Sequence, residues 1–382
     1  MAARMSSSHR AVAIIFLCVS VACTSTEDPS PASSSSGAPA SGGSPAIVFN
    51  RDESGEDLAV FTIQVDGSGE RRIRAVGDGA ILSPDGTRFM DPRPAGDGRL
   101  TTSVFHADGS AYEVLPLDDP TLQLGYGAWS PDATRIVTDG WDETRADRKG
   151  LYTRRSSDGG DIVRLTDAGI RYDFPMTPGG YSPDGSRILF FRPSTRAEGD
   201  GEPMDLFMVR VDGTGLRKLD PPGTTTGLVG GGIAASWSPD GEEVAVVLSS
   251  GSFWDDDARA VYVVDTIGSD VERITPRGDI LSAQWSPDGR WIAFDMADHT
   301  GSHDLFVVHP DGTGLAQLTS SDVDGLFSFG PMWSPDGTKL LFVRGVDELD
   351  STDLWIVNVD GTSLSQVTHT LGSYGGYAWV PR

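Results

Sequence analysis

The chain has 382 residues and a formal net charge of −25, with 55 acidic and 30 basic residues. A protein with this much negative charge repels nucleic acid and anionic lipid surfaces, and we therefore expect no nucleic-acid partner. Cations such as Ca²⁺ and basic peptides would instead be attracted. The 47 glycines and 24 prolines fall mostly between short apolar runs, which favours many short strands over helices and allows one large repeat domain or two ordinary ones.

Residues 1–22 have the pattern of a secretory signal peptide. Arg4 and Arg10 precede an apolar run at 11–22 that is too short to span a bilayer. The run ends Val-Ser-Val-Ala directly before Cys23, which resembles a bacterial lipobox, where the cysteine is lipidated after cleavage. The alternative is ordinary signal cleavage nearby. We expect a lipidated Cys23 and an extracytoplasmic protein whose lipid anchor is its only contact with the membrane.

A tether is predicted after the anchor. Residues 23–45 are rich in Ser, Pro and Gly, which is typical of a flexible linker. A tether behind a lipidated cysteine is the usual arrangement of a surface lipoprotein, so the two features support each other. Cys18 lies in the segment that would be removed, so the mature chain would form no internal disulfide.

A five-residue motif, Trp-Ser-Pro-Asp-Gly, organises the rest of the chain, residues 46–382. It occurs three times unchanged and three times as a close variant, beginning at Leu82, Trp129, Tyr181, Trp237, Trp285 and Trp333. The Pro and Gly predict a tight turn, and the apolar or alternating run that follows predicts a strand. We expect the first residue of the motif to end the incoming strand and to pack in the core. Ala133 replaces the glycine in one variant and should strain its turn.

The motif recurs at spacings of 47 to 56 residues, counted from serine to serine. Each unit also contains a second hairpin with an Asp-Gly turn, as at 304–319. A repeat of this length with four short strands is typical of a β-propeller blade. Each unit is therefore predicted to contain strand A, the Ser-Pro-Asp-Gly turn, strand B, a loop, strand C, the Asp-Gly turn and strand D.

The chain contains seven B–C–D sets but only six of the motifs. The first set, from Ile47, lacks a strand A, and the C-terminal segment 375–381 supplies one, because Trp379 lies 46 residues after Trp333. We therefore predict an all-β fold: a seven-bladed propeller of four-stranded antiparallel blades. Pairing of the C-terminal strand with the N-terminal blade would close the ring and remove its free sheet edges.

These repeats resemble the TolB-like, WD-like propeller family, in which Trp-Ser-Pro-Asp-Gly and Asp-Leu-Tyr/Trp-Val recur. The resemblance covers 46–382 and implies a propeller and, for many members, an extracytoplasmic interaction role. The chain departs from TolB in having seven units instead of six and a tether instead of an N-terminal α/β domain, which puts a Tol–Pal function in doubt. The same repeats occur in prolyl-oligopeptidase-like enzymes and in oligogalacturonate lyases.

Strand order places the tight A–B and C–D turns on one face of the ring and the longer B–C and D–A loops on the other. Because binding sites concentrate in variable loops on a rigid scaffold, we predict that the B–C and D–A face, around the channel mouth, is the functional one. Aromatic rings beside carboxylates suit a sugar or peptide ligand; the alternative is that the rings cover the blades and the acids are solvated. The candidate ligand-binding residues are Trp141, Asp142, Arg145, Tyr172, Asp173, Trp254, Asp255, Asp256, Asp257, His299, His303 and Tyr374.

Metal binding is left open by the sequence. The three acids at 255–257 could bind Ca²⁺, although their spacing is not that of an EF-hand. Asp298, His299 and His303 could hold a transition metal, together with His369 from across the ring. Lyases with these repeats hold a divalent metal through histidines over the channel, but that pattern does not match this chain residue by residue. No other cofactor is expected. The Asp that opens strand C recurs in several units, which indicates a structural hydrogen bond, at Asp57, Asp205, Asp304 and Asp353.

No motif of covalent or phosphate chemistry is present. The chain has no Gly-x-Ser-x-Gly elbow, no phosphate-binding Gly loop and no Cys-based metal motif, and the repeats leave no room for an α/β-hydrolase domain. No catalytic residue is predicted. We expect a monomeric, lipid-anchored, non-catalytic binding propeller whose partner is an extracytoplasmic protein, peptide or cell-wall glycan. The alternative is a metal-dependent carbohydrate-active enzyme, similar to oligogalacturonate lyase, that acts at the channel mouth.

Overall fold

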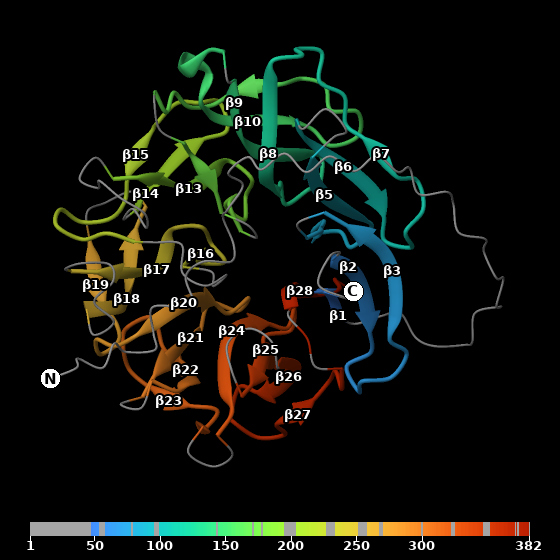
Figure 1. The fold of residues 1–382 in the computed structure, drawn as a ribbon. Coiled ribbons are helices and arrows are strands. Elements are labelled where there is room, and N and C mark those ends of the chain that lie inside the picture. Colours follow the sequence, from blue (N-terminus) through green and yellow to red (C-terminus); the bar gives the residue numbers. More distant parts are fainter. Residues whose placement is uncertain are drawn as a thin grey trace, which may run out of the picture.

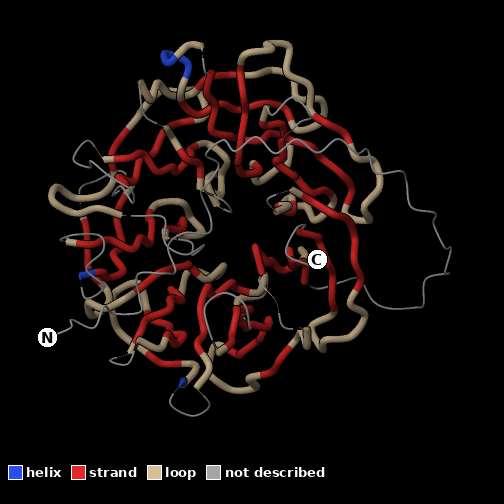
Figure 2. The backbone as a smooth tube through the Cα atoms, in the orientation of Figure 1, coloured by secondary structure: helices blue, strands red, loops and turns tan. Residues whose placement is uncertain are grey.

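In a computed structural model, the chain forms a ring of seven four-stranded antiparallel sheets around a central axis (Figure 1). Strands make up most of its regular structure (Figure 2), and a short 3₁₀ helix, η2 (Ala146–Arg148), precedes one of them. No helix in the described part of the chain is long and apolar enough to cross a bilayer. The structure describes residues 47–52, 58–77, 79–94, 99–142, 144–169, 172–176, 179–194, 204–226, 234–250, 258–266, 270–298, 301–321, 325–346, 352–370, 372 and 374–381.

Each blade is named by its four strands, A to D, from the channel outward. The A strands of blades 1 to 7 are β28 (Tyr374–Trp379), β4 (Ile81–Leu82), β8 (Leu122–Trp129), β12 (Phe174–Pro175), β16 (Ala235–Trp237), β20 (Ile280–Trp285) and β24 (Phe327–Trp333). The B strands are β1 (Ile47–Asp52), β5 (Arg88–Pro94), β9 (Arg135–Asp142), β13 (Arg187–Pro193), β17 (Glu243–Ser249), β21 (Ile292–Ala297) and β25 (Lys339–Gly345). The C strands are β2 (Leu58–Ile63), β6 (Leu100–His106), β10 (Gly150–Arg155), β14 (Met204–Arg210), β18 (Arg259–Asp265), β22 (His303–Val308) and β26 (Thr352–Asn358). The D strands are β3 (Arg71–Val76), β7 (Glu113–Val114), β11 (Val163–Arg164), β15 (Arg217–Lys218), β19 (Val271–Arg273), β23 (Ala316–Gln317) and β27 (Ser365–Gln366).

The predicted closure of the ring is confirmed. The last strand, β28, pairs antiparallel with the first described strand, β1, with Trp379 opposite Ile47, so that these two strands lie side by side in one blade (Figure 1). The indole N–H of Trp379 also donates a hydrogen bond to the carbonyl of Met332 in blade 7, at 3.1 Å. Strand β28 therefore completes the sheet of blade 1 and also ties that blade to blade 7.

The six motif turns have one internal hydrogen-bond pattern. In each, the Ser hydroxyl donates to the Asp carboxylate at 2.5 to 2.7 Å and accepts from the backbone N–H five residues later. The expected strain at Ala133 is present, because this residue has φ 56°, which costs a residue with a Cβ about 1 kcal/mol. The motif is therefore scaffold, since its polar groups are satisfied within the turn.

The core lies between blades. Strand B of each blade has neighbours on both faces, so most of its residues are buried, and each of the seven blade interfaces contains its own cluster of buried apolar residues. Three of the four motif tryptophans join these interfaces by donating their indole N–H groups to the preceding blade. The donors and acceptors are Trp129 and Ile81, Trp237 and Gly180, and Trp333 and Gln284.

The expected structural role of the Asp that opens strand C is confirmed in blades 6 and 7; in blade 4 Asp205 instead pairs with Lys218 at 2.9 Å, and Asp57 lies outside the described residues. The carboxylate of Asp304 accepts a hydrogen bond from the hydroxyl of Thr319 at 2.8 Å, and Asp353 does the same with Thr368. Each of these threonines in turn accepts from the backbone N–H of the next strand C residue. The pairing ties strand C to the end of strand D, where the outermost strand has only two or three residues.

One core position departs from the repeat in blade 3. The residue opposite the second position of strand B is apolar in six blades: Ile63, Phe105, Val209, Val264, Val308 and Val357. In blade 3 it is Arg154, opposite Ile136. Arg154 is fully buried, and none of its guanidinium nitrogens has a hydrogen-bond partner among the described residues. Burial lowers the pKa of Arg154 to about 10.

Candidate functional site

Blades 3 and 4 form a charged rim on the B–C and D–A face, where buried carboxylates hold basic side chains. Asp142, the last residue of β9, has a fully buried side chain that lies 3.0 Å from Arg148. Arg148 also pairs with Asp119 at 2.6 Å. Hydrogen bonds from Thr144, Thr121 and Arg148 hold the pKa of Asp142 well below its usual range. The carboxylate is therefore ionised and fixes Arg148 in place.

The rim continues from blade 3 into blade 4 through a cation–π contact. The ammonium of Lys149 lies 3.7 Å from the centre of the Tyr172 ring, and Tyr172 is 37% exposed. The next residue, Asp173, is buried and pairs with Arg192 at 2.5 Å, and the hydroxyl of Thr166 donates to its carboxylate. Tyr172 therefore presents one ring edge to solvent on a backbone that Asp173 anchors.

Two further predicted residues lie beside this rim. Arg145 precedes η2 and its side chain is 58% exposed; it pairs with Asp147, whose side chain is 71% exposed, at 3.1 Å. Solvent-exposed pairs of this kind contribute less than about 1 kcal/mol, so Arg145 can exchange this contact for a ligand at little cost. Trp141 is half-buried in β9, opposite Gln123.

A second charged set lies on the same face in blade 6, around His303, the first residue of β22. The imidazole is buried and has a carboxylate beside each ring nitrogen. Asp279 lies 3.5 Å from Nε2 and Asp295 lies 3.4 Å from Nδ1. Asp279 also contacts Arg259 of blade 5 at 3.0 Å, and the hydroxyl of Ser282 donates to Asp295. The set joins blade 5 to blade 6.

The two carboxylates keep this imidazole protonated. Burial alone would lower the pKa of His303, but its contacts with Asp279 and Asp295 outweigh burial and raise the pKa to about 10. A protonated ring has no lone pair to offer a metal ion. Among the residues that the structure describes, no group of three His, Cys, Asp or Glu side chains is arranged to hold a metal. In this geometry His303 acts as a buried cation.

Tyr374 belongs to the closure of the ring. Its hydroxyl lies 2.8 Å from the hydroxyl of Thr368 and 3.0 Å from the carbonyl of Thr370, and its ring packs against Phe49 with centroids 5.6 Å apart. These contacts join β28 to blade 7 and to β1.

The structure thus brings five of the predicted residues onto the rim of blades 3 and 4, which are Trp141, Asp142, Arg145, Tyr172 and Asp173. His303 lies in blade 6 and Tyr374 in blade 1, away from that rim. The remaining predicted site residues lie outside the described part of the chain; they are Cys23, Trp254, Asp255, Asp256, Asp257 and His299.

Sequence reasoning missed the basic partners and several acids, among them Asp119, Asp279 and Asp295. Arg148, Lys149 and Arg192 complete the rim, but nothing in their local sequence marks them among the other basic residues. Asp295 carried a usable signal, because it interrupts the apolar run of a strand B that is otherwise buried on both faces. A buried acid in such a run needs a partner, and here His303 and Ser282 supply it.

The comparisons with known proteins point to one family. Residues 223–370 match the family model of the TolB beta propeller domain. An uncharacterized protein of Agrobacterium fabrum is 27% identical over 221 residues, which cover 56% of this chain and 67% of that protein. The Tol-Pal system protein TolB of Syntrophus aciditrophicus is 44% identical over 54 residues, or 14% of this chain and 12% of that protein.

A solved oligogalacturonate lyase from Vibrio parahaemolyticus is similar in fold, with a TM-score of 0.55 and 15% identity over 78% of this chain and 87% of that one. The segment that matches the family model contains blades 5, 6 and 7 whole, with three unchanged copies of the motif. The other four blades have the same strand order and, in three of them, the same turn. Residues 223–370 therefore match the TolB beta propeller domain, and the whole described chain is a seven-bladed β-propeller built from the same repeat.

Proposed function

We propose that this propeller is a non-catalytic binding protein whose ligand contacts the rim of blades 3 and 4. The observation that carries the proposal is the layering of the rim. Arg145 and Tyr172 are exposed, with Lys149 against the Tyr172 ring, above the carboxylates of Asp142 and Asp173. A rigid layer that holds exposed cationic and aromatic side chains is typical of a binding surface.

The rim suits a protein, a peptide or a cell-wall glycan. The exposed part of the Tyr172 ring can pack against a sugar ring or an apolar side chain, and its hydroxyl can accept or donate a hydrogen bond. A guanidinium such as that of Arg145 pairs with carboxylates or hydroxyl oxygens. The buried acids are held by internal contacts, so they orient the rim and leave the ligand contacts to the residues above them.

The protein would act outside the cytoplasm on a lipid anchor at Cys23. The supporting features are the signal-like segment 1–22, the cysteine at its end and the Ser/Pro/Gly-rich tether at 23–45. Mass spectrometry of the membrane fraction tests the anchor. A lipidated N-terminal Cys23 is expected, and an unmodified Cys23, or a mature chain that begins after it, would contradict it.

Binding can be tested with the soluble domain 46–382, immobilised and exposed to envelope proteins and to peptidoglycan fragments in parallel. The ligand so identified should bind the double variant Arg145→Ala, Tyr172→Ala at least about ten-fold more weakly, since both contacts would be lost. The matched control is Leu364→Ala, which is exposed on the opposite face. Equal loss in the control would show that the rim is not the contact surface.

The enzyme alternative gives a different result in the same preparation. A metal-dependent lyase would retain stoichiometric transition metal after purification and would cleave polygalacturonate with a rise in absorbance from the unsaturated product. Either result would contradict a non-catalytic role, whatever the binding experiment shows.

A further inference from the structure

A hollow of about 490 Å³ lies on the tight-turn face between blades 4 and 5, on the side of the ring opposite the rim. Its described lining contains three arginines and no acid; the lining residues used below are Arg187, Met208, Arg210, Leu216, Arg217 and Thr266. Three guanidinium groups around one hollow are unexpected in a protein of net charge −25. We call this feature the blade 4–5 hollow.

The three arginines have contacts with neutral groups, and none of them forms an ion pair with a carboxylate among the described residues; Asp184 and Asp212 interact with Arg187 and Arg210 only electrostatically. Arg187 donates to the hydroxyl of Thr266 at 3.0 Å and to the carbonyl of Gly241 at 2.7 Å. Arg217 donates to the carbonyl of Thr266 at 2.8 Å. Arg187 and Arg210 lie directly opposite each other on β13 and β14, and like charges in that position destabilise a sheet. A bound anion would remove this cost.

Blade 3 has an internal carboxylate at the corresponding place. There the opposed pair is Arg135 and Arg155, and Asp161 pairs with Arg135 at 2.6 Å. Asp161 lies four residues before Leu165, which follows β11, and has φ 53°. Four residues before Leu219, the equivalent leucine of blade 4, the chain has Gly215, with φ 69°. The backbone conformation is shared, but the carboxylate is absent from blade 4.

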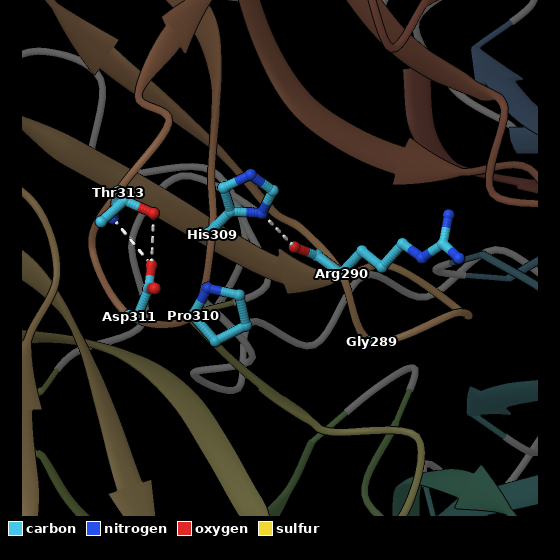
Figure 3. Close-up of a pocket in the computed structure, with 6 residues that line it drawn as sticks. All are labelled: Gly289, Arg290, His309, Pro310, Asp311 and Thr313. Carbon is cyan, nitrogen blue, oxygen red and sulfur yellow. Dashed lines mark hydrogen bonds between the residues drawn. The ribbon is translucent and has the colours of Figure 1, made fainter.

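Blade 6 shows a third solution at the same turns (Figure 3). Its opposed positions are occupied by Trp291 and His309, whose rings stack with centroids 3.8 Å apart, so no anion is needed. A hollow at these turns includes an acid of its own, Asp311, which accepts from Thr313. The side chain of Arg290 extends away from His309 and is 78% exposed. The unneutralised cluster is thus a property of blade 4.

We propose that the blade 4–5 hollow binds a carboxylate of an acidic peptide segment on a partner protein. The carboxylate would neutralise Arg187, as Asp161 neutralises Arg135 in blade 3, and would also be bound by Arg210 and Arg217 of the same hollow, since guanidinium groups can form paired hydrogen bonds with a carboxylate. Leu216 is 47% exposed at the edge of the hollow, and Met208 lies beneath it. An apolar side chain next to the acid would cover Leu216, which favours a peptide over a uronate glycan.

The test is a fluorescence-anisotropy titration of domain 46–382 with a labelled peptide of alternating Glu and Leu, against its Gln and Leu counterpart. The acidic peptide should bind, more weakly as salt rises, and the Gln peptide should not. Arg210→Gln and Arg217→Gln should each weaken binding about ten-fold, because each removes a charge-assisted contact. Arg290→Gln, on the same face but outside the hollow, should leave binding unchanged.

Gly215→Asp is the decisive variant, because it would place in blade 4 the internal carboxylate that blade 3 already has. A Cβ at this position would meet the Arg210 side chain at 3.6 Å, an ordinary contact, and Asp is among the residues that tolerate positive φ. We expect binding to be lost while the unfolding temperature is maintained. Retained binding in a folded Gly215→Asp variant would overturn the proposal. If that variant fails to fold, retained binding in Arg210→Gln and Arg217→Gln overturns it instead.

A second probe separates the ligand classes. Oligogalacturonate should bind this hollow more weakly than the acidic peptide does. If oligogalacturonate binds more tightly than the peptide, and Arg210→Gln abolishes that binding, the ligand is a glycan and the assignment to a peptide is wrong. The double variant Arg145→Ala, Tyr172→Ala should bind the acidic peptide normally, because it alters the opposite face. Failure of this proposal is therefore distinguishable from failure of the proposed function.

Discussion

Replacing Arg154 with methionine should stabilise the propeller. In the six other blades the same position holds an apolar residue that packs against the preceding blade. Arg154 instead places a fully buried guanidinium between blades 2 and 3, with no hydrogen-bond partner among the described residues. Methionine retains most of the length of the side chain and removes the charge, and such replacements of buried charges are often stabilising.

The size of the effect follows from the pKa. Burial lowers the pKa of Arg154 from 12.5 to about 10, and since each pKa unit equals 1.36 kcal/mol, the charged form is destabilised by about 3 kcal/mol. Imperfect packing of the new side chain would offset about 1 kcal/mol. We therefore expect the free energy of unfolding to rise by about 2 kcal/mol. With an unfolding entropy of about 2.1 cal/mol/K per residue, the midpoint temperature should rise by roughly 3 °C.

The assay is urea unfolding of the 46–382 domain, followed by tryptophan fluorescence, together with differential scanning calorimetry. Arg155→Met is the matched control. Arg155 is the next residue of β10, and its side chain is half exposed and forms a surface ion pair with Asp158. This variant should therefore change the free energy of unfolding by less than about 0.5 kcal/mol. The pH dependence gives a further check. Below pH 10 arginine is charged in the folded and unfolded states, so the whole penalty applies.

Between pH 10 and 12.5 the folded state releases the Arg154 proton and the unfolded state keeps it. The unfolded state then binds more protons, so the stability of the wild type rises with pH relative to the variant. The advantage of Arg154→Met should therefore shrink above pH 10. A variant that is less stable than the wild type at pH 7 by 1 kcal/mol or more would refute the reasoning, since it would mean that the guanidinium has a stabilising partner.

Two other perturbations test the closure and the buried histidine. Trp379→Phe removes the indole hydrogen bond to the carbonyl of Met332. The control is Trp285→Phe, because the indole N–H of Trp285 has no hydrogen-bond partner among the described residues. The first variant should lose about 1 kcal/mol more of the free energy of unfolding than the second, and equal losses in urea unfolding would contradict a role for the hydrogen bond. The pKa of His303 is raised above its ordinary 6.5, so its stabilisation is complete below pH 6.5 and is lost as pH rises toward 10. The wild type should therefore lose stability relative to His303→Gln between pH 6.5 and 10, and a constant difference would argue against a protonated ring beside Asp295.

The fold could be predicted because its signals are local. A Ser-Pro-Asp-Gly turn specifies its own hydrogen bonds over five residues, so six copies identify six hairpins without any knowledge of distant contacts. Even the exception at Ala133 was predictable, since the turn requires a positive φ whichever residue occupies it. The closure by Trp379 required only the strand count and the repeat length, because the first blade lacks a strand A and the C-terminal segment is the one strand left over to supply it.

The candidate site was predictable only in part, because side-chain direction depends on register. Asp142 and Asp173 were identified as loop acids beside aromatic residues, and they do lie on one rim. Their carboxylates turn inward, however, to Arg148 and to Arg192, and the latter pair is separated by 19 residues. Which side of a strand an acid faces follows from the pairing of neighbouring strands, and a shift of one residue would reverse it.

Register also reveals exceptions that a search for motifs passes over. Once the blades are aligned through their strand pairings, Arg154 stands where the other blades have apolar residues. Asp295 shares its position with Asp139 of blade 3, whereas blades 4, 5 and 7 have an apolar residue there. The opposed pair Arg187 and Arg210 lacks the neighbouring acid that blade 3 supplies. A requirement of the scaffold applies to every blade, so it does not explain residues that only one or two blades contain. The first two exceptions are buried between blades, where a ligand from solvent does not reach them, so their effects should be on stability. The arginine pair of blade 4 lines an open hollow, and for that reason it is the exception most directly connected to binding.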